Sequence, residues 1–147
     1  MDDYGRRVVL TMRFEDGVGE TCRAIRAEGL VVIARVDLRD HFWRILGHDF
    51  RQYVLLDVWS PDAALEALGQ DFEVGTILPT RFAVYELDDG NTAVVASEPF
   101  SRMAAEPDWR RHAPRLAAIA DRETEQIARV LGRLRDAARA RPVAPAA

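Results

Sequence analysis

The sequence predicts an α+β fold, namely a two-layer, largely antiparallel sheet with helices on one face and an added long C-terminal helix. Short runs in which apolar and polar residues alternate indicate strands, and segments with helical spacing separate the first three of them. A polar turn between two later apolar runs indicates a hairpin. The expected order is therefore strand–helix–strand, then strand–helix–hairpin, and finally the long helix.

The first part of the chain supplies the strand–helix–strand unit. Residues 6–14 alternate as a strand, and the helix after them ends at Gly29, a residue type that suits the left-handed position after a helix. Residues 30–37 form the next strand, and a short helix covers about residues 39–46. A link this short between two strands requires the first helix to pack on its own sheet.

The second unit begins with a strand at residues 53–59. Ser60, which is followed by a proline, is a good N-cap for a helix that runs to about Leu68. Residues 75–99 have the pattern of a hairpin, with the polar residues 88–91 as its turn.

The composition changes after residue 99, and this change sets the expected domain organisation. Residues 1–99 form the α+β domain, and residues 100–113 form a connector. Apolar residues at a spacing of about 3.5 predict a helix over residues 114–140 that packs on or extends the same domain, in cis or across a dimer. Residues 141–147 are expected to be a disordered tail.

Length, charge and cysteine content exclude several classes of protein. A chain of 147 residues is long enough for one domain with its own core. A net charge of −4 argues against a nucleic-acid or anionic-membrane partner. No apolar run has the length of a signal peptide or a membrane span, so we expect a soluble, cytoplasmic protein. Cys22, the single cysteine, lies on the apolar stripe of the first helix, which favours a small core residue over a reactive thiol.

Both faces of the predicted sheet are apolar, which is unusual for a sheet with helices on one side only. In the strand at residues 53–59, one face carries three aliphatic residues and the other carries Tyr53, Leu55, Asp57 and Trp59. A sheet face open to water normally carries polar residues. The C-terminal helix, another subunit or a ligand should therefore cover the second face, and we favour a homodimer.

A candidate ligand site lies on this second face. If the first three strands are neighbours, two arginines and one aspartate share it with two aromatic side chains. Either an internal Arg–Asp pair or a small anionic or aromatic ligand completes such a group. Thr80 and Arg81, which follow the Leu-Pro corner of the hairpin, are expected at the rim of this candidate site. The candidate binding residues are Arg13, Arg35, Tyr53, Asp57, Trp59, Thr80 and Arg81.

A weaker candidate is a metal site around the short helix. Asp37 and His41 are four residues apart, and a turn at Gly47 brings His48 back toward them. The spacing of the two histidines matches no standard ligand pattern. No nucleophile motif and no phosphate-binding loop stands out elsewhere, so the sequence assigns no catalytic residue and no cofactor.

The order of motifs from Phe14 to Pro99 resembles the Domain of Unknown Function 302 family. The stretches GHDFRQYVLLDVWSPDAALEAL and GTILPTRFAVYE carry the resemblance. It implies an α+β domain, often dimeric, with no established activity. Many members carry a cysteine before the proline of the first stretch and another after the Leu-Pro of the second. Trp59 and Thr80 occupy the corresponding places here, which argues against thiol or thiolate–metal chemistry in this chain.

Three function classes remain open at this point. The favoured one is a non-enzymatic, homodimeric module that binds a small molecule or a protein partner through the second sheet face. The alternative is an enzyme, or a redox or metal-handling protein, that uses His41, His48 or Asp57. The third is a structural partner of another chain that docks through the long helix.

Overall fold

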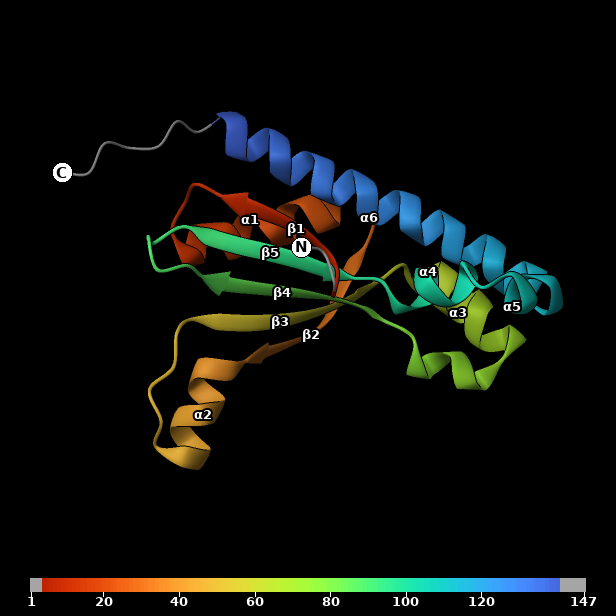
Figure 1. Ribbon diagram of the computed structural model, residues 1–147, viewed down its shortest axis with the longest axis horizontal. Helices are drawn as coiled ribbons and strands as arrows, with labels where there is room; N and C mark the ends of the chain where they lie inside the picture. The colour runs from red at the N-terminus through yellow and green to blue at the C-terminus, as the bar shows by residue number, and fades with distance from the viewer. Residues whose placement is uncertain (1–3, 141–147) are drawn as a thin grey trace.

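The computed structural model describes residues 4–140, and these residues form one five-stranded sheet in the order β1-β5-β4-β3-β2 (Figure 1). All neighbouring strands are antiparallel. The predicted α+β class is therefore confirmed. The strands are β1 (Arg6–Leu10), β2 (Val31–Asp37), β3 (Tyr53–Trp59), β4 (Thr80–Glu86) and β5 (Thr92–Ser97).

Helices lie on both sides of the sheet and at one end of it (Figure 1). The two longest, α1 and α6, cover one face, whereas α2 projects on the opposite side. None of the helices between residues 4 and 140 is both long and apolar enough to cross a bilayer. The helices are α1 (Phe14–Ala27), α2 (Leu38–Leu46), α3 (Pro61–Gln70), the 3-10 helix η1 (Phe72–Thr76), α4 (Pro99–Ala104), α5 (Pro107–His112) and α6 (Pro114–Ala140).

The main core lies between the sheet and the pair α1 and α6. Alternate residues of each strand point into it, as the period of two requires, and each fully buried aliphatic or aromatic side chain contributes about 1.5–3 kcal/mol. The largest of these buried side chains are Leu10, Ile25, Leu30, Val54, Leu56, Val58, Phe82, Ile127, Leu131 and Leu134. A second apolar cluster, around Phe100 and Ile119, joins α3, α4 and α6 at the end of the sheet.

The long helix α6 has the predicted bounds, and it packs on α1 and β1 of its own chain. Ion pairs hold it there, because Arg129 and Arg133 donate to the two carboxylate oxygens of Glu28 at 2.9 and 2.8 Å. Hydrogen bonds from Arg133 and Arg129 lower the pKa of Glu28. Since α1 and α6 share one face of the sheet, neither helix covers the other face.

Two element boundaries differ from the sequence expectation. β1 ends at Leu10, and α1 begins at Phe14, where the acidic residues Glu15 and Asp16 favour the positive end of the helix dipole. The segment 100–113, expected to be a connector, contains most of α4 and all of α5, each of which starts with a proline at its first helical position. The expected tail at residues 141–147 lies outside the described residues.

Candidate functional site

The second face of the sheet is left open by the helices between residues 4 and 140, apart from one corner near α2. We call it the open face. Its side chains come from all five strands. Those that are half-exposed or exposed are Arg7, Val9, Val31, Ala34, Val36, Tyr53, Leu55, Asp57, Trp59, Arg81, Ala83, Tyr85, Val95 and Ser97.

One ion pair lies among the apolar side chains of the open face. Arg81 and Asp57 stand directly opposite each other on β4 and β3. The Arg81 Nε atom donates to Asp57 Oδ1 at 2.8 Å and Nη2 donates to Oδ2 at 3.2 Å. These hydrogen bonds raise the pKa of the Arg81 guanidinium. The Asp57 side chain is mostly covered, whereas half of the Arg81 side chain remains accessible to a ligand.

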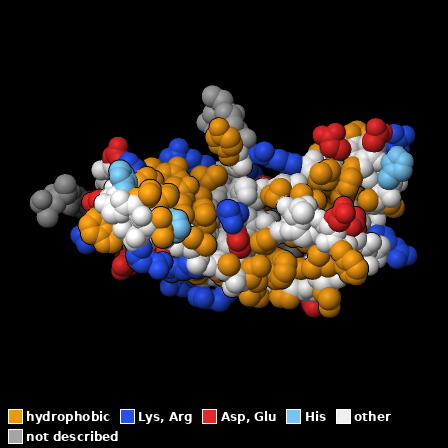
Figure 2. Space-filling view, turned by 90° about the horizontal axis from the view of Figure 1, so that it is seen from below, with side chains coloured by type: hydrophobic (Ala, Val, Ile, Leu, Met, Phe, Trp, Pro, Cys, Tyr) orange, Lys and Arg blue, Asp and Glu red, His pale blue; other side chains and the backbone are white. Residues whose placement is uncertain are grey.

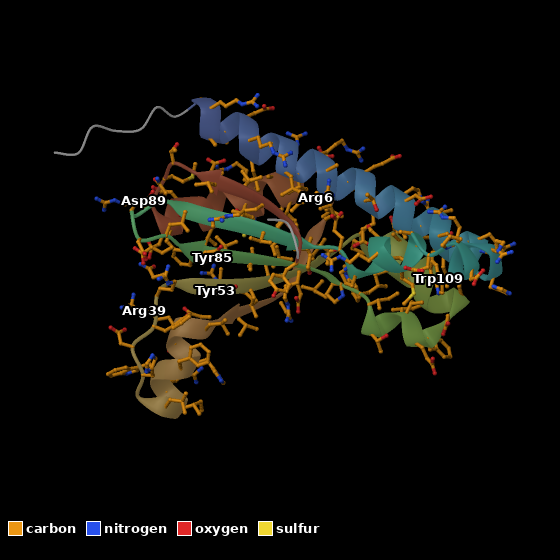
Figure 3. All side chains as sticks on the ribbon, in the orientation of Figure 1. Arg6, Arg39, Tyr53, Tyr85, Asp89 and Trp109 are labelled. Carbon is orange, nitrogen blue, oxygen red and sulfur yellow. The ribbon has the colours of Figure 1, made fainter. Side chains whose placement is uncertain are left out.

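Two stacked tyrosines lie further along the same strands. Tyr53 and Tyr85 are opposite each other, with ring centroids 5.1 Å apart and planes 11° apart (Figure 3). Burial, and secondly the neighbouring Tyr85, raise the pKa of Tyr53. The row of rings continues to α2. The ring centroid of Phe50 lies 6.3 Å from that of Tyr53, and the ring centroid of Phe42 lies 5.2 Å from that of Phe50. This aromatic row is the contact between α2 and the open face.

Arg13 is not on the open face, so its predicted place in the candidate site is wrong. β1 ends three residues before it, and Arg13 is instead the N-cap residue of α1. It lines a surface depression at the end of the sheet together with Asp16 and Asn91.

Arg35 is also not on the open face. The pairing of β2 with β3 shifts between Val32 and Ala34, which leaves Ile33 as an extra residue in the edge strand. A bulge of this kind reverses the side to which the following residues point. Arg35 therefore stands opposite Leu56, on the side of the sheet that carries α1 and α6.

Thr80 lies in the interior rather than in the open site. It is 2% exposed, and its hydroxyl donates to the carboxylate of Glu123 in α6. Glu123 is itself 6% exposed. Burial raises the pKa of Glu123, the Thr80 hydrogen bond lowers it, and the charge of Glu98 raises it further, so that the net shift is upward. Of the seven predicted binding residues, the open face thus brings together Tyr53, Asp57, Trp59 and Arg81.

The histidines of the weaker metal hypothesis lie on and just after α2. Among residues 4–140, no group of three or more His, Cys, Asp or Glu side chains has the arrangement of a metal site. The His41 ring packs edge-on to Phe42 at 5.6 Å. Asp57 is the remaining candidate residue of the enzyme alternative, and its carboxylate forms an ion pair with Arg81.

Comparison with protein families identifies the relationship. The family described as Domain of unknown function DUF302 matches residues 6–134. The chain belongs to this family. The match is wider than the resemblance in the sequence, which covered Phe14 to Pro99, and it includes most of α6.

One solved structure illustrates the fold of the family. The crystal structure of an uncharacterized conserved DUF302 protein from Bacillus stearothermophilus has a TM-score of 0.74 to this chain at 22% sequence identity. The alignment covers 90% of this chain and 99% of that one. At this identity the likeness shows the fold alone. No curated protein matches the chain.

Sequence reasoning missed two features that the fold creates. The first is the buried Thr80–Glu123 pair, for which the only signal was a glutamate within the apolar stripe of the long helix. The second is the projection of α2 away from the core, since the helix contains no buried residue. An amphipathic pattern predicts that a helix has an apolar side, but not which surface that side meets.

Proposed function

We propose that the protein is a non-enzymatic binding module that works as a homodimer and uses the open face as its functional surface. The observation that supports this proposal is the amount of apolar surface on a sheet face without a covering layer. Val9, for example, is 41% exposed, and Tyr53, Leu55 and Trp59 are half-exposed. Monomeric soluble proteins seldom leave apolar residues contiguous in this way unless the surface binds something.

The chemistry of the open face favours a small aromatic anion as its ligand. Arg81 uses two of its three guanidinium nitrogens on Asp57 and keeps half of its side chain accessible. The tyrosine pair lies four residues further along both strands, which is about 13 Å away. An elongated aromatic ligand can pack against Tyr53 and Tyr85 at one end while an acidic group at its other end reaches Arg81, since Arg binds planar anions through several donors.

The dimer is tested by a charge placed on the open face. Ala83 is half-buried in the middle of that face, between Leu55 and Val95 on the neighbouring strands. We expect wild-type protein to elute as a dimer in size-exclusion chromatography with light scattering, and Ala83→Arg to elute as a monomer. Leu65→Arg on α3, which replaces a 75% exposed leucine elsewhere, is the matched control and should remain dimeric. A dimeric Ala83→Arg protein with an unchanged melting temperature would contradict the proposal.

The ligand site is tested with a fluorescent aromatic sulfonate, 1-anilinonaphthalene-8-sulfonate. Wild-type protein should bind this probe saturably, and Arg81→Gln should weaken binding by roughly tenfold, the effect of about 1.4 kcal/mol. Arg23→Gln, which removes an exposed arginine of α1, is the control and should bind as wild type does. Equal binding by Arg81→Gln would exclude this arginine from the site. Native mass spectrometry of freshly purified protein then reports the subunit number and any ligand retained from the cell.

A further inference from the structure

We propose that α2 is an arm that packs on the open face of a second copy of this chain around Ala83, with each copy covering this part of the open face of the other. This inference rests on the proposed function, because it names what covers the open face in the homodimer. The inference adds one specific contact, in which α2 of one copy packs on the open face of the other copy.

The first reason is that α2 carries apolar side chains that nothing between residues 4 and 140 buries. Trp43, Ile45 and Leu46 are 61%, 68% and 70% exposed, and no residue of the helix is buried. The helix has nine residues and ends at Gly47 in the left-handed conformation. Isolated helices of this length are marginal in water and need tertiary packing of their apolar side. Such packing requires a surface outside the described chain.

The second reason is the place of α2 in the molecule. It projects away from the sheet on the side opposite to α6, and apolar side chains gather over it at the left of Figure 2. Its apolar attachment to its own sheet runs through Phe42 and Phe50 to Tyr53. An arm that stands off at the border of an open sheet face can reach the same face of another copy without covering its own.

The third reason is the match in area. Taking about 200 Å² for each large side chain, the exposed parts of Trp43, Ile45 and Leu46 amount to roughly 400 Å². The part of the open face that these side chains cover loses a similar accessible area. Each copy of a reciprocal dimer contributes one arm and one covered face, and therefore buries on the order of 800 Å². This is the area per partner of a standard stable interface. A helix packed on a sheet is also the usual way in which an apolar sheet face is covered.

The fourth reason is the charge on the two surfaces. The open face carries two arginines, Arg7 and Arg81, against one aspartate, Asp57. α2 itself carries two arginines and one aspartate, and the flanking Asp37 and Asp49 give the segment 37–49 three aspartates against two arginines. The two surfaces therefore attract each other, whereas two open faces or two arms placed together would each repel. A two-fold axis generates both arm–face contacts at once, which makes the dimer closed.

Arginine substitutions separate this inference from the proposed function. Leu46→Arg on the arm should raise the dissociation constant of the dimer by roughly tenfold or more, as Ala83→Arg on the open face does, because each places a charge in the same contact. Leu65→Arg again serves as the control. If Ala83→Arg dissociates the dimer and Leu46→Arg does not, the arm is refuted while the open face stands. If neither variant differs from the control, both proposals fail.

Crosslinking shows whether the arm meets the face. In a Cys22→Ser background, one protein carries Leu46→Cys and a second, of different mass through a tag, carries Ala83→Cys. Each has a single thiol, so a short bis-maleimide can join only different copies. We expect the mixture to give mainly the product that joins the two unlike copies. Products that join only like copies, at unchanged circular dichroism of both proteins, would overturn the inference.

Discussion

Replacement of Glu123 by glutamine is expected to stabilise the protein at neutral pH. The carboxylate is 6% exposed, and burial, the largest cause, raises its pKa above the ordinary value of 4.5. Each unit of upward shift means that the ionised group costs the folded state about 1.4 kcal/mol. Glutamine keeps the shape and an oxygen that can accept from the Thr80 hydroxyl, and it removes the charge.

The sign and size of the effect follow from linkage. A carboxyl group whose folded pKa is raised stabilises the fold fully below its unfolded pKa, near 4.5, and this contribution is lost as the pH rises through the folded pKa. The Thr80 hydrogen bond favours the ionised form and offsets part of the burial cost, and the net upward shift of the pKa already includes it. We expect a net gain of about 1 kcal/mol at pH 8, or roughly 2–4 °C in melting temperature for a chain of this size, and little difference at pH 4.

The assay is thermal unfolding followed by circular dichroism from pH 4 to pH 8, at one fixed protein concentration because the melting temperature of a dimer depends on it. Glu125→Gln, which changes an exposed carboxylate two residues further along α6, is the matched control and should show no such gain at high pH. The reasoning fails if the advantage of Glu123→Gln over wild type is the same at every pH, or if it shrinks as the pH rises.

Four further substitutions test the packing of particular residues. Gly17→Ala should destabilise the protein by about 1–3 kcal/mol in urea unfolding, because its Cβ would lie 2.6 Å from the Thr92 Cγ2 atom. Gly19→Ala, with nothing within 4 Å of its Cβ, should instead stabilise α1 by about 0.5–1 kcal/mol. Cys22→Ser should lower the melting temperature slightly and leave dye binding intact, since the half-buried thiol packs against the core; lost dye binding at full stability would make the thiol functional. Trp59→Ala should weaken the dimer and cost about 2 kcal/mol, less than a fully buried tryptophan, because Trp59 packs half-exposed against the second apolar cluster; unchanged sizing and melting would contradict that placement.

Local signals in the sequence were sufficient for most of the fold. β3 has the predicted bounds, because a short apolar run rich in β-branched and aromatic residues, followed by a Ser-Pro pair, is typical of a buried strand. Ser60 caps α3 as expected, accepting from the Ala63 amide at 3.4 Å. α6 also has the predicted bounds, because its apolar repeat is long. These features depend on neighbours in the sequence, which is why pattern and capping rules find them.

The candidate site was predicted only in part, because it depends on pairing between distant strands. Asp57 and Trp59 lie on one face as their spacing in β3 requires, and Arg81 joins them through the register of β4. Arg35 was placed wrongly because a single extra residue in β2 changes the side of every later residue in that strand. No rule of composition or spacing reveals a bulge of this kind, since the pattern of apolar residues reads equally well with and without it.

The position of α6 changes what the apolar second face implies. From the sequence, the long helix was one of three candidates to cover that face, and a monomer could then have buried all its apolar surface. In the structure α6 lies beside α1 on the first face, where Leu134 and Ile127 complete the core. The two longest helices thus cover one face of the sheet. The nine-residue helix α2, none of whose residues is buried, lies next to the uncovered face. The molecule thus has two incomplete surfaces, a helix without a sheet and a sheet face without a helix. In the proposed dimer, each of them is completed by the other surface of a second copy.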